Sequence, residues 1–185
     1  MQLVWPELLH LPSYTAALEA GWSADHVRGV AAAKEERVRI KEDPKLFIAS
    51  LIDREAKGDP VELPDGSTAK RIPGLRRWMW DGDFCGVISF RWQPGSEALP
   101  PHCLGHIGYA VVPNKRNRGF ATEALRATLP LARAEGLRYV EVTTDPDNLA
   151  SQRTIEKAGG VLYERFTKPS QFSGKPGLRY RIELA

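Results

Sequence analysis

Basic side chains gather in the segment VVPNKRNRGFATEAL, residues 111–125, just before an expected helix. The segment holds Lys115, Arg116 and Arg118, and Gly119 stands at the expected helix start. The first N–H groups of a helix lack intrahelical partners, and its aligned peptide dipoles add about half a positive charge there. A phosphate at this end gains from both, and a glycine lets it come close to the backbone. The segment is therefore either an anion-binding loop or a solvated basic turn.

Other kinds of phosphate loop fit the segment less well. The Walker pattern Gly-Lys-Ser/Thr is absent. The dinucleotide-binding fingerprint needs a second and a third glycine, whereas this segment contains only Gly119. Ala121 keeps the following position small, and Thr122 adds a hydroxyl. A nucleic-acid site is disfavoured, because the basic stretch is short, Glu123 follows it closely, and the net charge is only +3.

The elements that surround this loop alternate between strands and helices. Periodicity and turn residues predict strands at 75–80, 84–92 and 104–112, a helix at 119–135, a strand at 138–144, a helix at 149–159, and strands at 160–166 and 178–184. This order predicts an α/β fold with a mixed, mainly antiparallel central sheet flanked by helices. The loop then lies within a strand–helix–strand crossover.

The first part of the chain predicts a less regular arrangement. Residues 3–9 resemble a short or edge strand, and residues 11–21 fit a helix. A helical pattern follows over residues 24–57, where Pro44 should break it. Residues 57–74 are rich in turn formers and predict a loop or flap.

Composition indicates an ordinary soluble globular protein. The 185 residues suggest a single domain, with 42% hydrophobic and 26% charged residues. The two cysteines, Cys85 and Cys103, are too few for a disulfide framework and lack the spacing of a metal site, so we expect free thiols and no metal. No stretch resembles a signal peptide or approaches the roughly 20 apolar residues of a membrane span, so we expect a cytoplasmic protein without membrane contact.

Two ordered motifs carry a resemblance to a known family. The loop reads Arg116-x-x-Gly119-x-Ala121, and DNLASQRTIEKAGG follows at residues 147–160. The first resembles the acetyl-CoA pyrophosphate loop of the GNAT N-acetyltransferase superfamily, and the second resembles that family's second motif. GHIGYAVVP at residues 105–113 and the late RYRI resemble a subgroup with a Gly-His-Ile-Gly-Tyr strand, which is related to the acetyltransferases of ribosomal-protein N-termini. The resemblance covers residues 75–184.

The resemblance implies acetyl-CoA as co-substrate. The pyrophosphate would be held by the loop and first helical turn, namely Arg116, Asn117, Arg118, Gly119, Phe120, Ala121 and Thr122. The pantetheine arm would lie between strands 104–112 and 138–144, which splay apart in the family, along backbone groups of Ala110, Val111 and Val112. Asn148 and Ser151 would lie beside the pantetheine and the sulfur.

The sequence departs from the family's second motif at one position. Many members have a tyrosine just before the Glu-Lys of that helix, as the acid for the departing thiolate, but this chain has Ile155. The resemblance to the ribosomal-protein subgroup then implies Ser151, or a water that it holds, as the donor. A hydroxyl is a weak acid, so Ser151 would stabilise the thiolate by a hydrogen bond.

Acyl transfer also needs a base, because the attacking amine must lose a proton near pH 7. Glu141 is one candidate, because a carboxylate on a strand that helices cover is costly to bury unless it has a function or a partner. The alternative is that Glu141 faces solvent. His106 is the other, since histidine has a reference pKa of about 6.5, although a buried structural histidine is the alternative. The N–H of Val111 or Val112 would stabilise the oxyanion.

These features predict an N-acetyltransferase that moves the acetyl group of acetyl-CoA to a primary amine by direct attack in a ternary complex. A non-catalytic CoA-binding or regulatory module is the alternative, because the tyrosine at position 155 is missing. The acceptor, a small-molecule or peptide amine, is left open, and residues 1–74 should help to shape its site. The resemblance also suggests a possible homodimer.

Overall fold

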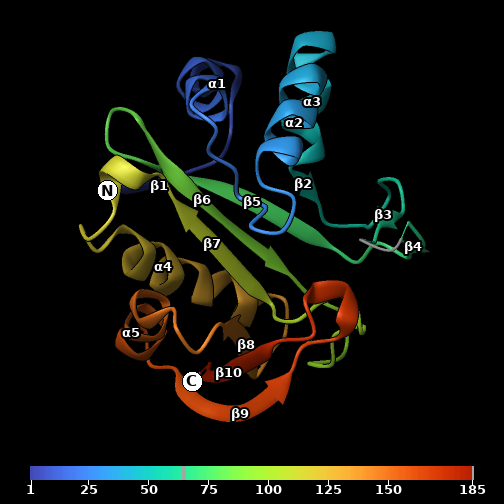
Figure 1. The fold of residues 1–185 in the computed structure, drawn as a ribbon, viewed down its shortest axis with the longest axis vertical. Helices are drawn as coiled ribbons and strands as arrows, with labels where there is room; N and C mark the ends of the chain where they lie inside the picture. The colour runs from blue at the N-terminus through green and yellow to red at the C-terminus, as the bar shows by residue number, and fades with distance from the viewer. Residues whose placement is uncertain (64–65, 185) are drawn as a thin grey trace.

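The computed structural model describes residues 1–63 and 66–184, which form helices and antiparallel strands (Figure 1). The helices are α1 Leu11–Glu19, α2 Val30–Glu42, α3 Pro44–Ser50, α4 Phe120–Ala134 and α5 Leu149–Lys157, with 3-10 turns η1 Leu8–His10, η2 Pro113–Lys115 and η3 Ser170–Phe172. The strands are β1 Gln2–Val4, β2 Ile52–Asp53, β3 Val61–Glu62, β4 Thr68–Ala69, β5 Gly74–Trp80, β6 Phe84–Arg91, β7 Ile107–Val111, β8 Tyr139–Thr144, β9 Val161–Thr167 and β10 Pro176–Glu183.

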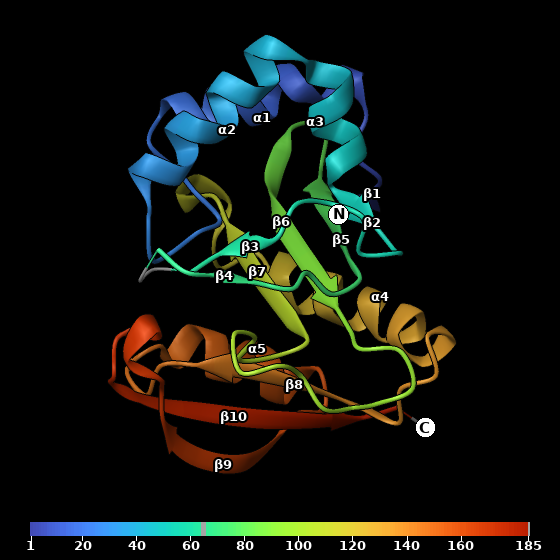
Figure 2. The same ribbon diagram turned by 90° about the vertical axis from the view of Figure 1, so that its right-hand side faces the viewer.

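The strands form two main sheets and one small hairpin. The larger sheet has the order β1-β5-β6-β7, with β2 also paired to β5, and the smaller sheet has the order β8-β10-β9. Strands β3 and β4 pair only with each other within the described residues. Figure 2 shows α1–α3 at one end of the molecule and the smaller sheet at the other. The predicted α/β fold, mainly antiparallel with helices around it, is confirmed, and the sheet is divided between β7 and β8.

Helices cover both faces of the larger sheet. Alternate residues of a strand point to opposite faces, which separates the buried side chains into two clusters. One face carries Trp78, Phe84 and Val87 and packs against side chains of α1–α3, including Tyr14 and Phe47. The other face carries Met79, Ile88 and Phe90 and packs against α4, α5 and the smaller sheet, including Leu125, Val140 and Ile155.

A partly buried polar cluster attaches α1 and α2 to the larger sheet. Tyr14 of α1 donates its hydroxyl hydrogen to Glu36 of α2. Arg76 of β5 donates from Nη1 to Oε1 of the same carboxylate at 3.0 Å. Burial raises the pKa of Tyr14, so the phenol stays neutral and acts as a donor. The cluster fixes the helices over the face that also carries Gly108 and Ala110 of β7.

The N-terminal helices follow the prediction, except that the helical stretch expected over residues 24–57 is shorter at both ends. It ends at Ser50, because Ile52 and Asp53 pair with β5 as strand β2. The helical pattern over residues 24–57 begins as α2 only at Val30, because the Asp25 carboxylate accepts hydrogen bonds from the N–H groups of Val27 and Arg28, each at 2.9 Å. Such local side-chain bonds compete with helix formation. The expected break at Pro44 is confirmed.

The expected loop at 57–74 contains the hairpin of β3 and β4. Its residues 64–65 lie outside the described part of the chain. From residue 75 onward the predicted strands and helices are confirmed in order. The strand expected at 104–112 is shorter, because residues 105 and 106 turn toward β8.

Candidate active site

The two main sheets come together at one point and then separate. The N–H of His106 donates to the carbonyl oxygen of Glu141 at 2.7 Å, and the N–H of Glu141 donates to Nδ1 of His106 at 2.9 Å. A Cβ at Gly105 would lie 2.9 Å from the same carbonyl oxygen, so the close approach depends on glycine. Beyond this junction β7 pairs with β6 and β8 pairs with β10, with no ladder between β7 and β8 in the described residues. The strands therefore diverge, as the resemblance implied.

The backbone edge of β7 faces this opening. The pairs Cys85–Val112 and Arg91–His106 are joined by backbone hydrogen bonds of 3.0 and 2.9 Å across β6 and β7. In an antiparallel ladder such bonded pairs alternate with non-bonded pairs. Tyr109 falls at a non-bonded position, as does Val111, so their N–H and C=O groups point away from β6 and toward β8.

This register distinguishes between the three residues expected along the pantetheine. Val112 already donates its N–H to Cys85, and Ala110 directs its backbone groups toward β6. Val111 is the one whose N–H and C=O face the opening. Its carbonyl oxygen accepts a hydrogen bond from Nε of Arg116 at 3.3 Å, which places the Arg116 side chain at the opening.

The expected pyrophosphate loop joins η2 to α4. Asn117 has φ 61° and Gly119 has φ 81°, so both are left-handed, and Gly119 is the N-cap of α4. Its carbonyl oxygen accepts the first helical hydrogen bond from Glu123, so the N–H groups of the preceding first turn remain without helical partners. This turn contains Phe120, Ala121 and Thr122, all half-buried.

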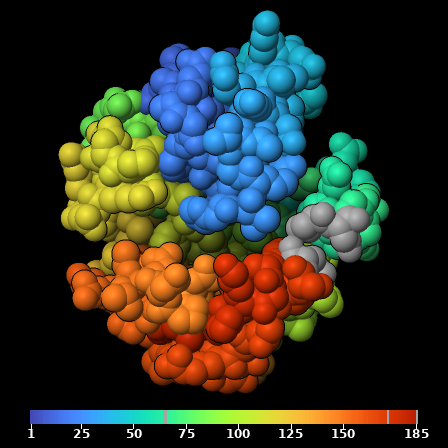
Figure 3. Space-filling view, in the orientation of Figure 1, coloured from blue at the N-terminus to red at the C-terminus, as the bar shows by residue number. Residues whose placement is uncertain are grey.

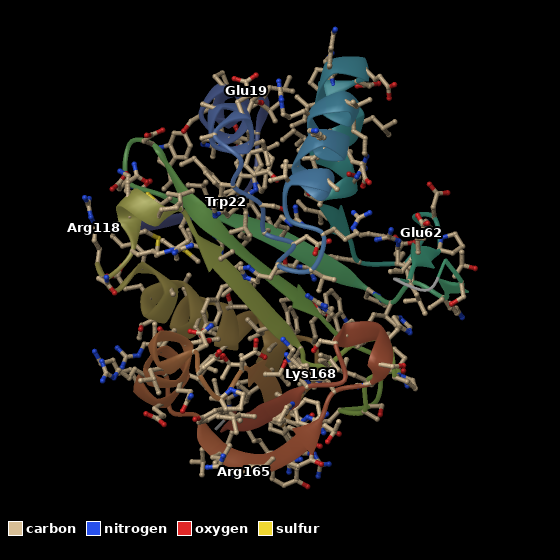
Figure 4. The ribbon with its side chains drawn as sticks, viewed as in Figure 1. Glu19, Trp22, Glu62, Arg118, Arg165 and Lys168 are labelled. Atoms are coloured by element: carbon tan, nitrogen blue, oxygen red, sulfur yellow. The ribbon has the colours of Figure 1, made fainter. Side chains whose placement is uncertain are left out.

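The three basic residues of the loop have different roles. Lys115 contacts both carboxylate oxygens of Asp81, at 2.8 and 2.9 Å, and so ties the loop to the turn between β5 and β6. Arg116 lies against Val111, and both Arg116 and Arg118 are exposed. Figure 4 shows Arg118 projecting outward from the loop before α4. Arg116 and Arg118 are therefore available to an anion at the helix start.

A hollow in the surface marks the same region. In Figure 3 it lies between the blue N-terminal helices, the yellow start of α4 and the orange segment of α5, and its floor has the olive colour of β7. On the C-terminal side, Lys168 forms an ion pair with Asp145 at the end of β8 (Figure 4). The segment after β9 is thereby held against the end of β8.

The start of α5 reaches the opening from the other side. Asn148 is the N-cap, and its Oδ1 accepts from the N–H of Ser151 at 3.0 Å. The Ser151 hydroxyl lies 2.8 Å from the hydroxyl of Tyr109, which extends from β7. Ile155 is fully buried in the core, so its position contributes no group to the opening.

Glu141 carries a carboxylate on the opposite face of β8 from Val140 and Val142, which are buried in the core. Its Oε1 accepts from Nη2 of Arg181 at 3.0 Å, and its Oε2 lies 3.6 Å from Nε of Arg179. The Glu141 side chain is 15% exposed. The mostly buried charge is therefore compensated by two guanidinium groups from β10.

His106 is fully buried between the sheets. Because Nδ1 accepts from the Glu141 N–H, the neutral imidazole carries its hydrogen on Nε2. Nε2 has no hydrogen-bond partner among the described residues. Burial is the main cause that lowers the pKa of His106 to about 4, so the ring is uncharged near neutral pH.

Comparison with known proteins assigns the chain to a family. The family profile described as "Acetyltransferase (GNAT) domain" matches residues 60–161, more than half of the 185-residue chain. The chain belongs to the GNAT acetyltransferase family. It is therefore an acetyltransferase, with acetyl-CoA as the acetyl donor. No curated protein sequence matches the chain.

Several solved acetyltransferase structures share this fold along nearly the whole chain. RimL, the ribosomal L7/L12 alpha-N-protein acetyltransferase in complex with coenzyme A, matches with a TM-score of 0.63 and 16% identity, covering 98% of this chain and 93% of that chain. The microcin C7 self-immunity acetyltransferase MccE, in complex with acetyl-CoA and AMP, has a TM-score of 0.59 and 13% identity, covering 98% and 91%. A GNAT-family acetyltransferase from Bordetella pertussis has a TM-score of 0.56 and 17% identity, covering 97% and 93%.

Three further structural observations concern this acetyltransferase as a whole. No helix within residues 1–63 and 66–184 is both long and apolar enough to cross a membrane. The same residues contain no group of three or more His, Cys, Asp or Glu side chains placed to hold a metal ion. Cys85 and Cys103 are both free thiols, as predicted.

The sequence prediction did not single out Tyr109, whose hydroxyl contacts Ser151 of this acetyltransferase's candidate site. The residue lies within the quoted strand motif GHIGYAVVP, but its side chain points to the face covered by α4 and α5. Its contact with Ser151 joins residues 42 positions apart. The alternation of side chains along the strand places Tyr109 on the α5 face, but only the packing of α5 brings Ser151 to it.

The lowered pKa of His106 predicts a pH-dependent stability. The unfolded chain takes up the proton near pH 6.5, whereas the folded chain resists it until about pH 4, so stability is lost as pH falls through this window. In the wild-type protein the free energy of unfolding should fall by on the order of 3 kcal/mol between these two pH values. We expect His106→Asn, which keeps a side-chain acceptor but does not titrate, to lack this fall. Urea unfolding of both proteins at several pH values measures the difference. His26→Asn, at an exposed histidine, should leave the pH dependence unchanged.

Proposed function

We propose that this chain is an N-acetyltransferase that binds acetyl-CoA between β7 and β8 and transfers the acetyl group by direct attack of an amine in a ternary complex. One observation carries the proposal. The N–H and C=O groups of Tyr109 and Val111 face the opening between the sheets, next to the start of α4. A pantetheine arm has amide groups that can pair with such an edge, while its pyrophosphate reaches the helix start.

The donor site has two parts. The pyrophosphate is held by backbone N–H groups at the start of α4 and by the side chains of Arg116 and Arg118, the two basic groups of the loop that have no acidic partner among the described residues. The thioester lies along Val111, whose N–H stabilises the oxyanion that forms when the amine attacks. Asn148 supports this arrangement by capping α5.

The acceptor amine approaches from the face covered by α1 and α2. Gly108 and Ala110 lie on this face of β7, and residues 1–74 contribute the helices and the β3–β4 hairpin around it. The acceptor is a primary amine of a small molecule or of a peptide. RimL, whose fold is similar, is a protein acetyltransferase, so this fold is compatible with a peptide acceptor.

Glu141 is the base in this proposal, acting through water. Its carboxylate keeps free lone pairs although Arg181 and Arg179 are close. His106 is less suited to the role, because its Nδ1 already accepts a backbone hydrogen bond and its Nε2 carries a hydrogen. We assign His106 the task of positioning the Glu141 backbone at the junction of the sheets.

Steady-state turnover of acetyl-CoA with a panel of peptide and small-molecule amines tests the function. We expect Glu141→Gln to lower kcat by about 100-fold, the usual contribution of a general base, and His106→Asn to keep most of the activity. Equal losses in both variants would contradict the assignment of the base. Circular dichroism spectra and melting temperatures of both variants show whether they are folded.

A second function, a CoA-binding module without turnover, has one observation in its favour. The buried Ile155 supplies no acid that could protonate the thiolate. A protein that only binds CoA releases no thiolate and therefore needs no such acid. Tight binding of CoA by calorimetry, together with no acetylation of any amine in the panel, would favour this function over the transferase.

A further inference from the structure

The hydroxyl of Tyr109 lies beneath the first turn of α5, where the proposed reaction releases its thiolate. Tyr109 Oη is 2.8 Å from Ser151 Oγ and 3.3 Å from the Ser151 carbonyl oxygen. The Tyr109 ring packs against the core on the α5 side of β7. The phenol is thus fixed against the first part of α5, where Thr154 also forms a side-chain hydrogen bond with it. Ser151 is the residue that we place beside the opening.

We propose that Tyr109 and Ser151 form a donor pair for the sulfur of CoA, in which Tyr109 positions the Ser151 hydroxyl so that its hydrogen points into the opening. This inference rests on the proposed function for the site at which CoA binds. It adds a residue, Tyr109, and a direction for the hydrogen bonds. Tyr109 is a positioning residue, and Ser151 is the group that contacts the sulfur.

The direction of the hydrogen bonds is part of the proposal. The phenol hydrogen can go to the Ser151 carbonyl oxygen at 3.3 Å or to Ser151 Oγ at 2.8 Å, a contact in which either hydroxyl can be the donor. We assign it to Oγ, which is the shorter contact. A phenol is also a stronger donor than an alkyl hydroxyl. When Ser151 Oγ accepts from the phenol, its own hydrogen is free to point elsewhere. A hydroxyl that accepts one hydrogen bond becomes a better donor in the next, because linked hydrogen bonds polarise each other.

The pair stabilises the thiolate without giving up its own protons. When the tetrahedral intermediate collapses, the carbon–sulfur bond breaks, the electron pair moves onto sulfur, and the new carbon–nitrogen bond remains. The proton lost by the amine passes to the base and finally to the sulfur or to solvent. Burial raises the pKa of Tyr109 to about 12, above the value of about 8.5 for a free thiol, so the phenol keeps its hydrogen throughout.

The core explains why the donor comes from β7. Ile155 lies one turn after Ser151 on the same helix. Its side chain is fully buried in the core and has no solvent-accessible surface. The Ile155 side chain is enclosed by apolar neighbours and offers no polar group to the opening. Tyr109, which enters from the neighbouring strand, places a hydroxyl at the first turn of α5 instead.

The pKa of the thiol of bound CoA tests the pair directly. It is measured from the ultraviolet absorbance of the thiolate as pH is raised, in the presence of saturating protein. We expect the wild-type protein to lower this pKa below that of free CoA, because a hydrogen bond favours the charged form. Tyr109→Phe and Ser151→Ala should each raise it by about one unit relative to wild type, and the double variant should show no further rise, because the residues act together.

Tyr180→Phe is the matched control. The Tyr180 hydroxyl also contacts α5, at Gln152 and Glu156, with distances of 3.3 and 3.4 Å. Its removal should change stability in the same way as Tyr109→Phe but leave the thiol pKa unchanged. If Tyr109→Phe and Tyr180→Phe give the same thiol pKa as wild type, the donor pair is refuted. If the wild-type protein does not bind CoA, the proposed function itself fails, which is a different result.

Discussion

Replacing Gly119 with valine is expected to weaken the binding of CoA by about 100-fold, which corresponds to about 2.7 kcal/mol. Gly119 has φ 81°, a conformation that costs a residue with a Cβ roughly 1–2 kcal/mol. The new side chain would also enter the space at the start of α4, where the nearest atom is Oε1 of Glu123 at 3.9 Å from the added Cβ. In the proposed complex this space belongs to the pyrophosphate. Isothermal titration calorimetry with CoA measures the change.

Gly136→Val separates the backbone effect from the effect on the ligand. Gly136 follows the other end of α4, has φ 86°, and also has open space around an added Cβ. Both variants should lose a similar amount of stability, because both force a valine into the left-handed region. Only Gly119→Val should weaken the binding of CoA. An equal affinity for CoA in the two variants would place the pyrophosphate elsewhere.

Gly86→Ala is expected to lower the stability of the folded protein by about 3–5 kcal/mol, at the upper end of single substitutions. An added Cβ would lie 2.3 Å from the carbonyl oxygen of Ala110 and 2.9 Å from Cα of Val111, closer than such atoms can approach. Gly86 also has φ 152°, which disfavours alanine. The melting temperature should fall by roughly 10 °C or more, as followed by circular dichroism.

The same clash should also affect the site. Gly86 pairs with Val111, whose outer edge is the proposed contact for the pantetheine, so movement of β6 displaces that edge. Gly108→Ala is the control in the same strand pair, because its added Cβ would meet only the flexible end of Arg91 at 3.5 Å. It should cost no more than about 1 kcal/mol. Equal melting temperatures for the two alanine variants would contradict the expected clash.

Local patterns predicted most of the elements from residue 75 onward. Strand β8 alternates buried and half-buried residues, strand β6 is an almost continuous apolar run, and glycines mark the ends of α4 and α5 at Gly136 and Gly159, both left-handed. The prediction was weaker before residue 75. There Asp25 delays the start of α2 by binding nearby N–H groups, a competition between side chain and helix that the helical pattern alone does not reveal.

The candidate site divides in the same way between local and distant causes. The loop from Arg116 to Thr122 was predicted, because its charges, its glycine and the following helix are neighbours in the chain. The roles of individual groups depend on contacts with distant segments. Lys115 is paired with Asp81, and Glu141 is paired with Arg181 of β10. The residues next to Lys115 and Glu141 in the sequence do not predict either partner.

The sequence by itself determined that a basic loop with a glycine precedes α4 and that strands and helices alternate around it, because both depend on residues close together in the chain. The tertiary structure decided which backbone groups of β7 face the opening, why His106 is uncharged, and that Tyr109 meets Ser151. The physical reason is strand register and burial. Both are set by packing between segments far apart in sequence. A shift of one residue in the pairing of β7 would turn the backbone groups of Val112, in place of those of Val111, toward the opening.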